Sequence, residues 1–86
     1  MTNIPHLLTD KDFRILQSAF DHCKEYDIAM TLGDYSLSVS VVPAPPVWGQ
    51  PMLIQVKQSR RCVDETKNCR SIEEVMWYLH MKGEKL

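Results

Sequence analysis

The fold is decided by residues 27–42, DIAMTLGDYSLSVSVV, which predict two β-strands joined by a tight turn. Apolar residues alternate with small or polar residues on both sides of Gly33-Asp34, a period of two that is typical of strands. Glycine accepts the positive φ that a type II′ turn requires at its first central position. We therefore expect a two-residue hairpin in which Leu32 faces Tyr35.

The register set by that turn places strands over residues 27–32 and 35–42 and gathers their apolar side chains on one face. The apolar cross-strand pairs are Leu32 with Tyr35, Met30 with Leu37, Ile28 with Val39, and Tyr26 with Val41. The opposite face pairs Thr31 with Ser36, Ala29 with Ser38, and Asp27 with Ser40. Slippage by one residue would turn the whole apolar set outward, so the pattern specifies the register strongly.

Two amphipathic helices flank the strands. The first is predicted over residues 10–25, with Thr9 as its N-cap and acidic residues in the first turn, where the helix dipole favours negative charge. Its apolar stripe is Phe13, Leu16, Phe20 and Cys23. The second is predicted over residues 72–82, where Ser71 and Glu74 fit a capping box. Its core stripe is Ile72, Val75, Met76 and Leu79.

The middle of the chain contains a proline-rich loop, residues 43–51, in which four of nine residues are proline. Prolines cannot donate ladder hydrogen bonds, so this segment is expected at the surface. A third strand is predicted over residues 52–57, with Leu53 facing outward. Residues 58–70 are polar and lack a sustained period. They are expected to form a loop, in which residues 62–63 either extend the third strand or make a brief fourth strand.

The expected order is α-β-β-β-α in a single domain of residues 1–86. A three-stranded antiparallel meander with one apolar face, covered by two helices, makes a two-layer α+β sandwich. The second face of the sheet is expected to stay uncovered, because an antiparallel sheet tolerates one face in water. That face would carry Ala29, Thr31, Ser36, Ser38, Ser40, Leu53, Gln55 and Lys57. A flat face of small hydroxyl groups can also receive another protein.

The composition argues against several classes of protein. Hydrophobic and charged fractions of 44% and 24% are ordinary for a globular protein and argue against disorder. A net charge of −1 gives no general electrostatic reason to bind nucleic acid or an acidic membrane. No apolar run approaches the roughly 20 residues that span a bilayer. Residues 1–8 lack the basic start and apolar core of a signal peptide. Three cysteines do not make a secreted disulfide framework, so a cytoplasmic location is expected.

No group of side chains predicts an enzyme, a cofactor, a metal site or a small-molecule substrate. Cys62 and Cys69 are seven residues apart, whereas zinc ligands usually come in pairs about two to four residues apart. A cysteine–histidine nucleophile pair has no residue in the pattern that would orient it. The alternating serines of the second strand lack a nucleophile-elbow motif, and three glycines leave no phosphate-binding loop.

The favoured interpretation is a small non-enzymatic protein-interaction module. The helix over residues 72–82 carries more apolar surface than a core stripe needs, because Trp77, Tyr78 and Met81 flank that stripe. These residues, together with Trp48 in the proline-rich loop, are the expected anchors for another protein or for a second copy in a homodimer. The build is common among accessory proteins of phages or mobile elements that bind or inhibit a host protein.

The alternative is a nucleic-acid-binding module that uses the basic residues of segment 57–70. These residues are Lys57, Arg60, Arg61, Lys67 and Arg70. The α-β-β-β-α order resembles that of the double-stranded-RNA-binding domain. That family carries a lysine-rich start to its second helix, whereas Ser71-Ile72-Glu73-Glu74 stands here and would repel phosphate. The resemblance therefore stops at topology, and we do not assign the chain to that family.

Overall fold

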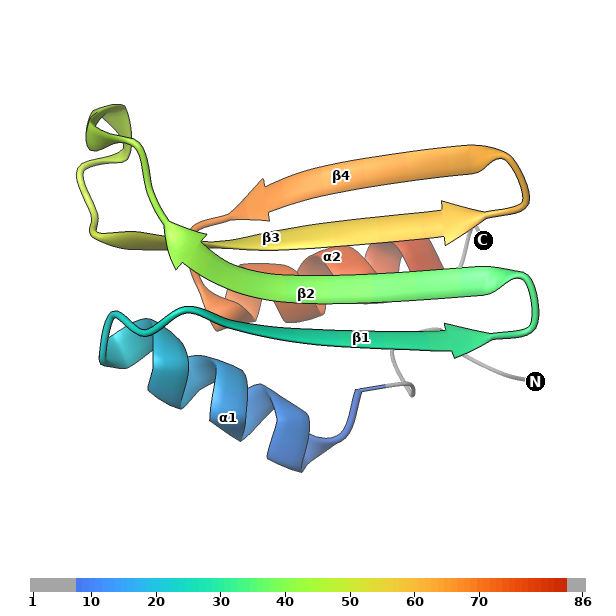
Figure 1. Ribbon diagram of the computed structural model, residues 1–86, viewed down its shortest axis with the longest axis horizontal. Helices are drawn as coiled ribbons and strands as arrows, with labels where there is room; N and C mark the ends of the chain where they lie inside the picture. The colour runs from blue at the N-terminus through green and yellow to red at the C-terminus, as the bar shows by residue number, and fades with distance from the viewer. Residues whose placement is uncertain (1–7, 84–86) are drawn as a thin grey trace.

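The computed structural model describes residues 8–83 and forms an α+β fold, as the sequence predicts (Figure 1). In chain order, its elements are α1 (Asp10–Asp21), β1 (Tyr26–Leu32), β2 (Tyr35–Pro43), the 3-10 helix η2 (Pro46–Trp48), β3 (Met52–Arg60), β4 (Val63–Cys69) and α2 (Ile72–Gly83). The prediction that residues 1–8 contain no signal peptide concerns a segment of which only Leu8 lies within the described residues.

The predicted hairpin is confirmed pair by pair. Strands β1 and β2 are antiparallel, and every Cα pairing from Tyr26 with Val41 to Leu32 with Tyr35 follows the predicted register. Gly33 has a φ of 63° and Asp34 does not have a positive φ, which is the pattern of a type II′ turn. The alternation of side chains and the turn chemistry thus agree on one pairing.

The sheet has four strands in the order β1-β2-β3-β4, and the prediction of three was wrong. Strand β3 continues to Arg60, and β4 occupies most of the segment expected to be a loop. Residues Arg61 and Cys62 form the tight connection between the two strands, which are paired from Arg60 with Val63 to Ile54 with Cys69. The observed order is therefore α-β-β-β-β-α.

Both helices pack on one face of the sheet and enclose the hydrophobic core, while the other face carries no helix (Figure 1). The fully buried large side chains are Leu16, Tyr35, Leu37, Val39, Val41, Ile54, Val56, Cys69, Val75 and Leu79. They come from α1, β2, β3, α2 and the end of β4, so the two central strands form the floor of the core.

Leu53 faces away from the core, as predicted, but the expectation that this position is uncovered was wrong, because Leu53 is only 4% exposed. It lies opposite Val42, at the end of the sheet from which the proline-rich loop leaves and to which it returns. The Ala44 amide donates to the Pro51 carbonyl at 3.0 Å and closes the base of that loop. The uncovered face is therefore polar along most of its length and apolar beside the loop.

Helix α1 begins as predicted and ends four residues earlier than predicted. Thr9 and Asp12 form a capping box, in which each side chain accepts from the other residue's amide. At the other end, Lys24 N–H donates to Ala19 O and Cys23 N–H donates to Phe20 O, with Cys23 at a φ of 55°. This is a Schellman motif, and it turns the chain directly into β1.

Candidate interaction surfaces

Helix α2 presents an exposed apolar face, which we call the α2 face and define as Met76, Trp77 and Met81. The exposed fractions of these residues are 47%, 61% and 40%. Trp77 and Met81 are one turn apart and therefore neighbours on the helix surface. The opposite side of α2 is buried in the core. One side of the helix packs in the core and the other side is also apolar. The helix thus carries more apolar surface than the fold needs.

Two predicted positions on α2 exchange their roles. Tyr78, expected as a partner anchor, is only 6% exposed and packs in the core, so that prediction was wrong. Its hydroxyl donates to Glu65 Oε1 at 3.4 Å. Met76, expected in the core stripe, is exposed instead. The buried tyrosine finds its polar partner on β4, a strand that the sequence pattern did not reveal.

Trp48 is half-buried and held by Arg70 at the end of β4. The Arg70 guanidinium lies 4.6 Å from the centre of the Trp48 ring. Arg70 Nη1 also donates to Trp48 O at 2.9 Å and to Gln50 Oε1 at 3.2 Å. Gln50 Nε2 donates back to Arg70 O at 3.1 Å. The proline-rich loop is therefore fastened to the sheet, and one face of the indole is occupied within the chain.

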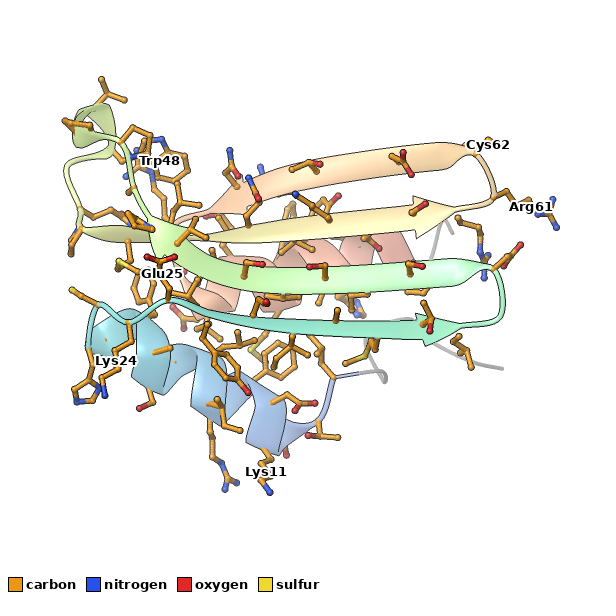
Figure 2. All side chains as sticks on the ribbon, in the orientation of Figure 1. Lys11, Lys24, Glu25, Trp48, Arg61 and Cys62 are labelled. Carbon is orange, nitrogen blue, oxygen red and sulfur yellow. The ribbon has the colours of Figure 1, made fainter. Side chains whose placement is uncertain are left out.

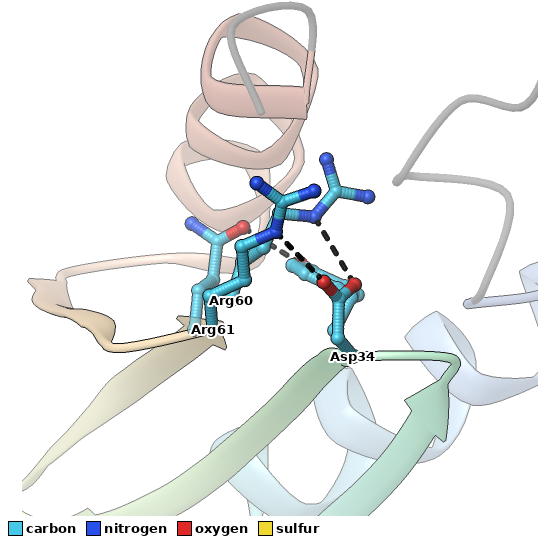
Figure 3. A network of polar contacts seen from close by, with 5 residues as sticks. Asp34, Arg60 and Arg61 are labelled. Atoms are coloured by element: carbon cyan, nitrogen blue, oxygen red, sulfur yellow. Dashed lines mark hydrogen bonds and ion pairs between the residues drawn. The ribbon is translucent and has the colours of Figure 1, made fainter.

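The basic residues of segment 57–70 do not form one surface. Figure 3 shows Arg60 and Arg61 converging on Asp34, with Arg60 Nε 3.8 Å from Oδ1 and Arg61 Nε 3.2 Å from Oδ2. Lys67 Nζ lies 3.8 Å from Glu74 Oε2 on α2. Arg61 lies at one end of the sheet, and Trp48, which Arg70 contacts, lies at the other (Figure 2). Lys57 stands apart from these pairs, on the uncovered face.

The uncovered face of the sheet contains a shallow, open hollow of about 620 Å³. Its polar lining includes the hydroxyl groups of Thr31, Ser36, Ser38, Ser59 and Thr66. The charged residues of the lining are one lysine and two acids, Lys57, Asp64 and Glu65. Aromatic side chains are absent from this lining, so the hollow offers hydrogen-bonding groups without a stacking surface.

A buried polar pair lies on the opposite, helix-covered side of the sheet. The Tyr35 hydroxyl donates to Gln58 Oε1 at 2.7 Å, and both residues are buried. Burial, followed by the nearby Tyr78, raises the pKa of Tyr35, against a smaller lowering by Arg60. The shift opposes ionisation of the phenol, which donates to Gln58 as a neutral hydroxyl.

The three cysteines are separate, free thiols. Cys23 and Cys62 are exposed, and Cys69 is fully buried. Burial, with a further contribution from Glu74 and an opposing one from Lys67, raises the pKa of Cys69 to about 11. Residues 8–83 contain no cluster of three or more histidine, cysteine or acidic side chains able to hold a metal ion. Over the same residues, neither helix has the length and apolar run that crossing a bilayer requires.

The arrangement offers several surfaces that could bind another molecule. Of the predicted anchors, Trp77 and Met81 lie together on the α2 face, Trp48 lies apart in the proline-rich loop, and Tyr78 belongs to the core. Met76 is also exposed, although it was predicted in the core stripe. The one sequence signal for its exposure is its position next to Trp77 on the helix. No protein-family model, curated protein or solved structure matches this chain.

Proposed function

We propose that this protein is a non-enzymatic interaction module that docks the α2 face into an apolar groove of a different protein. The observation that carries the proposal is the exposure of Trp77, with Met81 one turn further along and Met76 beside it. Tryptophan and methionine are enriched at protein interfaces, and a large aromatic side chain supplies much contact area at little entropic cost.

Helix α2 is anchored at its start by several polar contacts, which favours binding by a preformed surface. The Glu74 amide donates to Ser71 Oγ at 3.2 Å, and Glu74 Oε1 accepts from the Arg70 amide at 2.7 Å. The same carboxylate pairs with Lys67 on β4. A helix fixed in this way loses little freedom on docking, as in other complexes in which an amphipathic helix fills a groove.

The charge beside the α2 face narrows the kind of groove that would receive it. Glu73 is exposed and lies one turn before Trp77 on the same side of the helix. It also stands in the first turn of α2. We therefore expect an apolar groove with a lysine or arginine at the end that receives the start of the helix.

The setting we propose is the cytoplasm, because three free thiols suit a reducing compartment. A small α+β domain without a recognised chemical motif suits an accessory protein of a phage or mobile element that binds or inhibits a host protein. Nucleic-acid binding has less support, because the basic residues are divided between the two ends of the sheet and most face an acidic partner.

The test combines partner identification with a matched pair of double variants. A protein captured from lysate is purified, and its dissociation constant is measured by calorimetry for the parent and for Trp77→Ser/Met81→Ser. We expect the double variant to bind about 30-fold more weakly or worse, because a central aromatic anchor carries much of the binding energy. Circular dichroism and thermal unfolding establish that the variant is folded.

The control is Lys11→Ser/Arg14→Ser, which changes two exposed positions on the outer side of α1. It should bind as the parent does. Equal binding by the α2 variant, or loss of binding only in the α1 control, would contradict the proposal. The indole of Trp77 offers a second readout, since its fluorescence should shift to shorter wavelength when the groove covers it.

A further inference from the structure

The two edges of the sheet differ in chemistry. Edge strand β4 carries Asp64, Glu65 and Lys67 among its seven residues. Edge strand β1, also seven residues long, contains no lysine, arginine or proline, and Asp27 is its one charged residue. Charged side chains and prolines are the usual protection of a sheet edge against pairing with another strand. By this measure β4 is protected and β1 is open.

The backbone of β1 has groups available on its outer side. In an antiparallel pair, narrow pairs that exchange both hydrogen bonds alternate with wide pairs whose backbone groups point away. The two-residue turn closes on the narrow pair of Leu32 with Tyr35. The N–H and C=O groups of Asp27, Ala29 and Thr31 therefore point outward. Within residues 8–83, none of these three residues makes a backbone hydrogen bond to a segment other than β2.

The hydrophobic core is also open along this side. The partly buried apolar residues that pack against the core are Phe13 and Phe20 of α1 and Ile28 and Met30 of β1. At the ends of β1, Tyr26 and Leu32 are 39% and 49% exposed. Figure 1 shows α1 projecting past the β1 edge, alongside the half of the strand that begins at Tyr26. A strand added at this edge would lie over that projecting part of α1.

We infer that β1 pairs antiparallel with β1 of a second copy, about a twofold axis at Ala29, to form one continuous sheet. In this register each outward-pointing residue meets another: Asp27 faces Thr31 of the second copy, and Ala29 faces its own counterpart. On the helix-covered face, Tyr26 meets Leu32 and Ile28 meets Met30, so all pairs there are apolar. Like charges do not meet in this register, because Asp27 is the one charged residue of the strand and it faces Thr31.

Several features make a second copy the fitting occupant. The strand is self-complementary in both its outward backbone groups and its apolar side chains. The twofold axis brings the exposed Leu32 of one copy beside Tyr26 and the projecting α1 of the other. The α2 face remains accessible, because α2 packs against β3 and β4 on the far side of the core. The inference therefore stands apart from the proposed function.

The test is solution mass by light scattering over a concentration series, on the full chain. The parent should have twice its chain mass of 10.0 kDa. Ala29→Pro removes an outward N–H at the twofold axis and leaves the narrow pairs with β2 intact, so this variant should be a monomer. Thr66→Pro is the matched control, because Thr66 occupies the equivalent outward position on the β4 edge, and it should remain a dimer.

A second variant guards against misfolding caused by proline. Ala29→Lys places two ammonium groups opposite each other across the axis, on the exposed face, and should also give a monomer, whereas Ala29→Ser should remain a dimer. A parent that is monomeric at all concentrations would overturn the inference. So would slow amide exchange of Asp27, Ala29 and Thr31 in such a monomer, which would identify another part of the same chain as the occupant.

The α2 double variant distinguishes this inference from the proposed function. Trp77→Ser/Met81→Ser should keep the dimer mass while losing the other protein. A dimer that dissociates in this variant but persists in Ala29→Lys would overturn both proposals, because the α2 face would then be the self-interface. Loss of the dimer in Ala29→Lys with unchanged partner binding would support both.

Discussion

At the residue scale, Cys23 holds a conformation that its side chain disfavours. It follows α1 in the left-handed region, at the position of the Schellman motif that glycine normally occupies. A residue with a Cβ pays roughly 1–2 kcal/mol for this conformation. Cys23 is exposed, so its side chain regains little of that cost by packing.

We therefore expect Cys23→Gly to raise the free energy of unfolding by about 1 kcal/mol. Urea unfolding of the reduced protein measures the change. The control is Cys23→Ala, which removes the same thiol and keeps the Cβ, and it should leave stability nearly unchanged. An equal gain in both variants would show that the thiol, and not the backbone conformation, sets the cost.

At the element scale, β4 is a strand made by its surroundings. Its sequence, VDETKNC, has little β-propensity and no apolar alternation. Its inward side chains nevertheless lie along α2, where Glu65 accepts from Tyr78 and Lys67 pairs with Glu74. Long polar side chains on an edge strand can contact a helix while their charged ends stay hydrated. An edge strand can therefore form without the apolar alternation that is typical of strands.

The hydrogen-bond alternation of β4 can be observed by amide exchange. Because Arg60 with Val63 closes the tight turn, the Glu65 and Lys67 amides point toward β3 and should exchange slowly. The Thr66 and Asn68 amides point outward and should exchange fast. A loop over these residues, as the sequence predicts, would instead give fast exchange at all four amides, which distinguishes the two descriptions in a single experiment.

The sequence predicted those parts of the fold in which several independent signals agree. The hairpin combines side-chain alternation with a glycine that the turn requires, and its predicted register is confirmed at every pair from Tyr26 with Val41 to Leu32 with Tyr35. The sequence of helix α2 gives no such agreement, because its own apolar residues lie on nearly all sides of the helix. Its buried stripe includes Tyr78, whose hydroxyl donates to Glu65, and Glu65 lies on the strand that the sequence pattern did not predict.

The candidate surfaces were predicted in part for the same reason. Trp77 and Met81 are exposed, as the excess of apolar residues on α2 predicted. The roles of Trp48 and of the basic residues depend on contacts between distant segments, such as that of Arg70 with the indole. The open side of β1 could not be recognised from its residues alone, because it also depends on the order of strands in the sheet and on where α1 packs.

At the scale of the whole molecule, a buried thiol and a buried phenol lower stability as the pH becomes alkaline. The pKa of Cys69 is raised to about 11, mainly by burial, and burial also raises the pKa of Tyr35. Below a pH of about 9, folded and unfolded states both keep the thiol proton, so Cys69 gives no pH dependence. Between about 9 and 11 the unfolded state loses that proton while the folded state holds it, and stability falls.

We expect Cys69 to account for a loss of about 2–3 kcal/mol in the free energy of unfolding as pH rises from 8 to 11. Urea unfolding at a series of pH values, under reducing conditions, measures it. Cys69→Ala should start lower, because it leaves a cavity, and should then fall less steeply with pH. Parallel curves for the two proteins would show that Cys69 does not titrate in the expected range.

The unequal edges of the sheet also bear on how far association can go. If each copy pairs through β1, the two open edges are consumed and both outermost strands of the joined sheet are β4. Each β4 carries two acidic residues and one lysine, Asp64, Glu65 and Lys67, which discourage a further strand. Growth by strand addition then ends at two copies, and the chain avoids the endless stacking that gives fibrils.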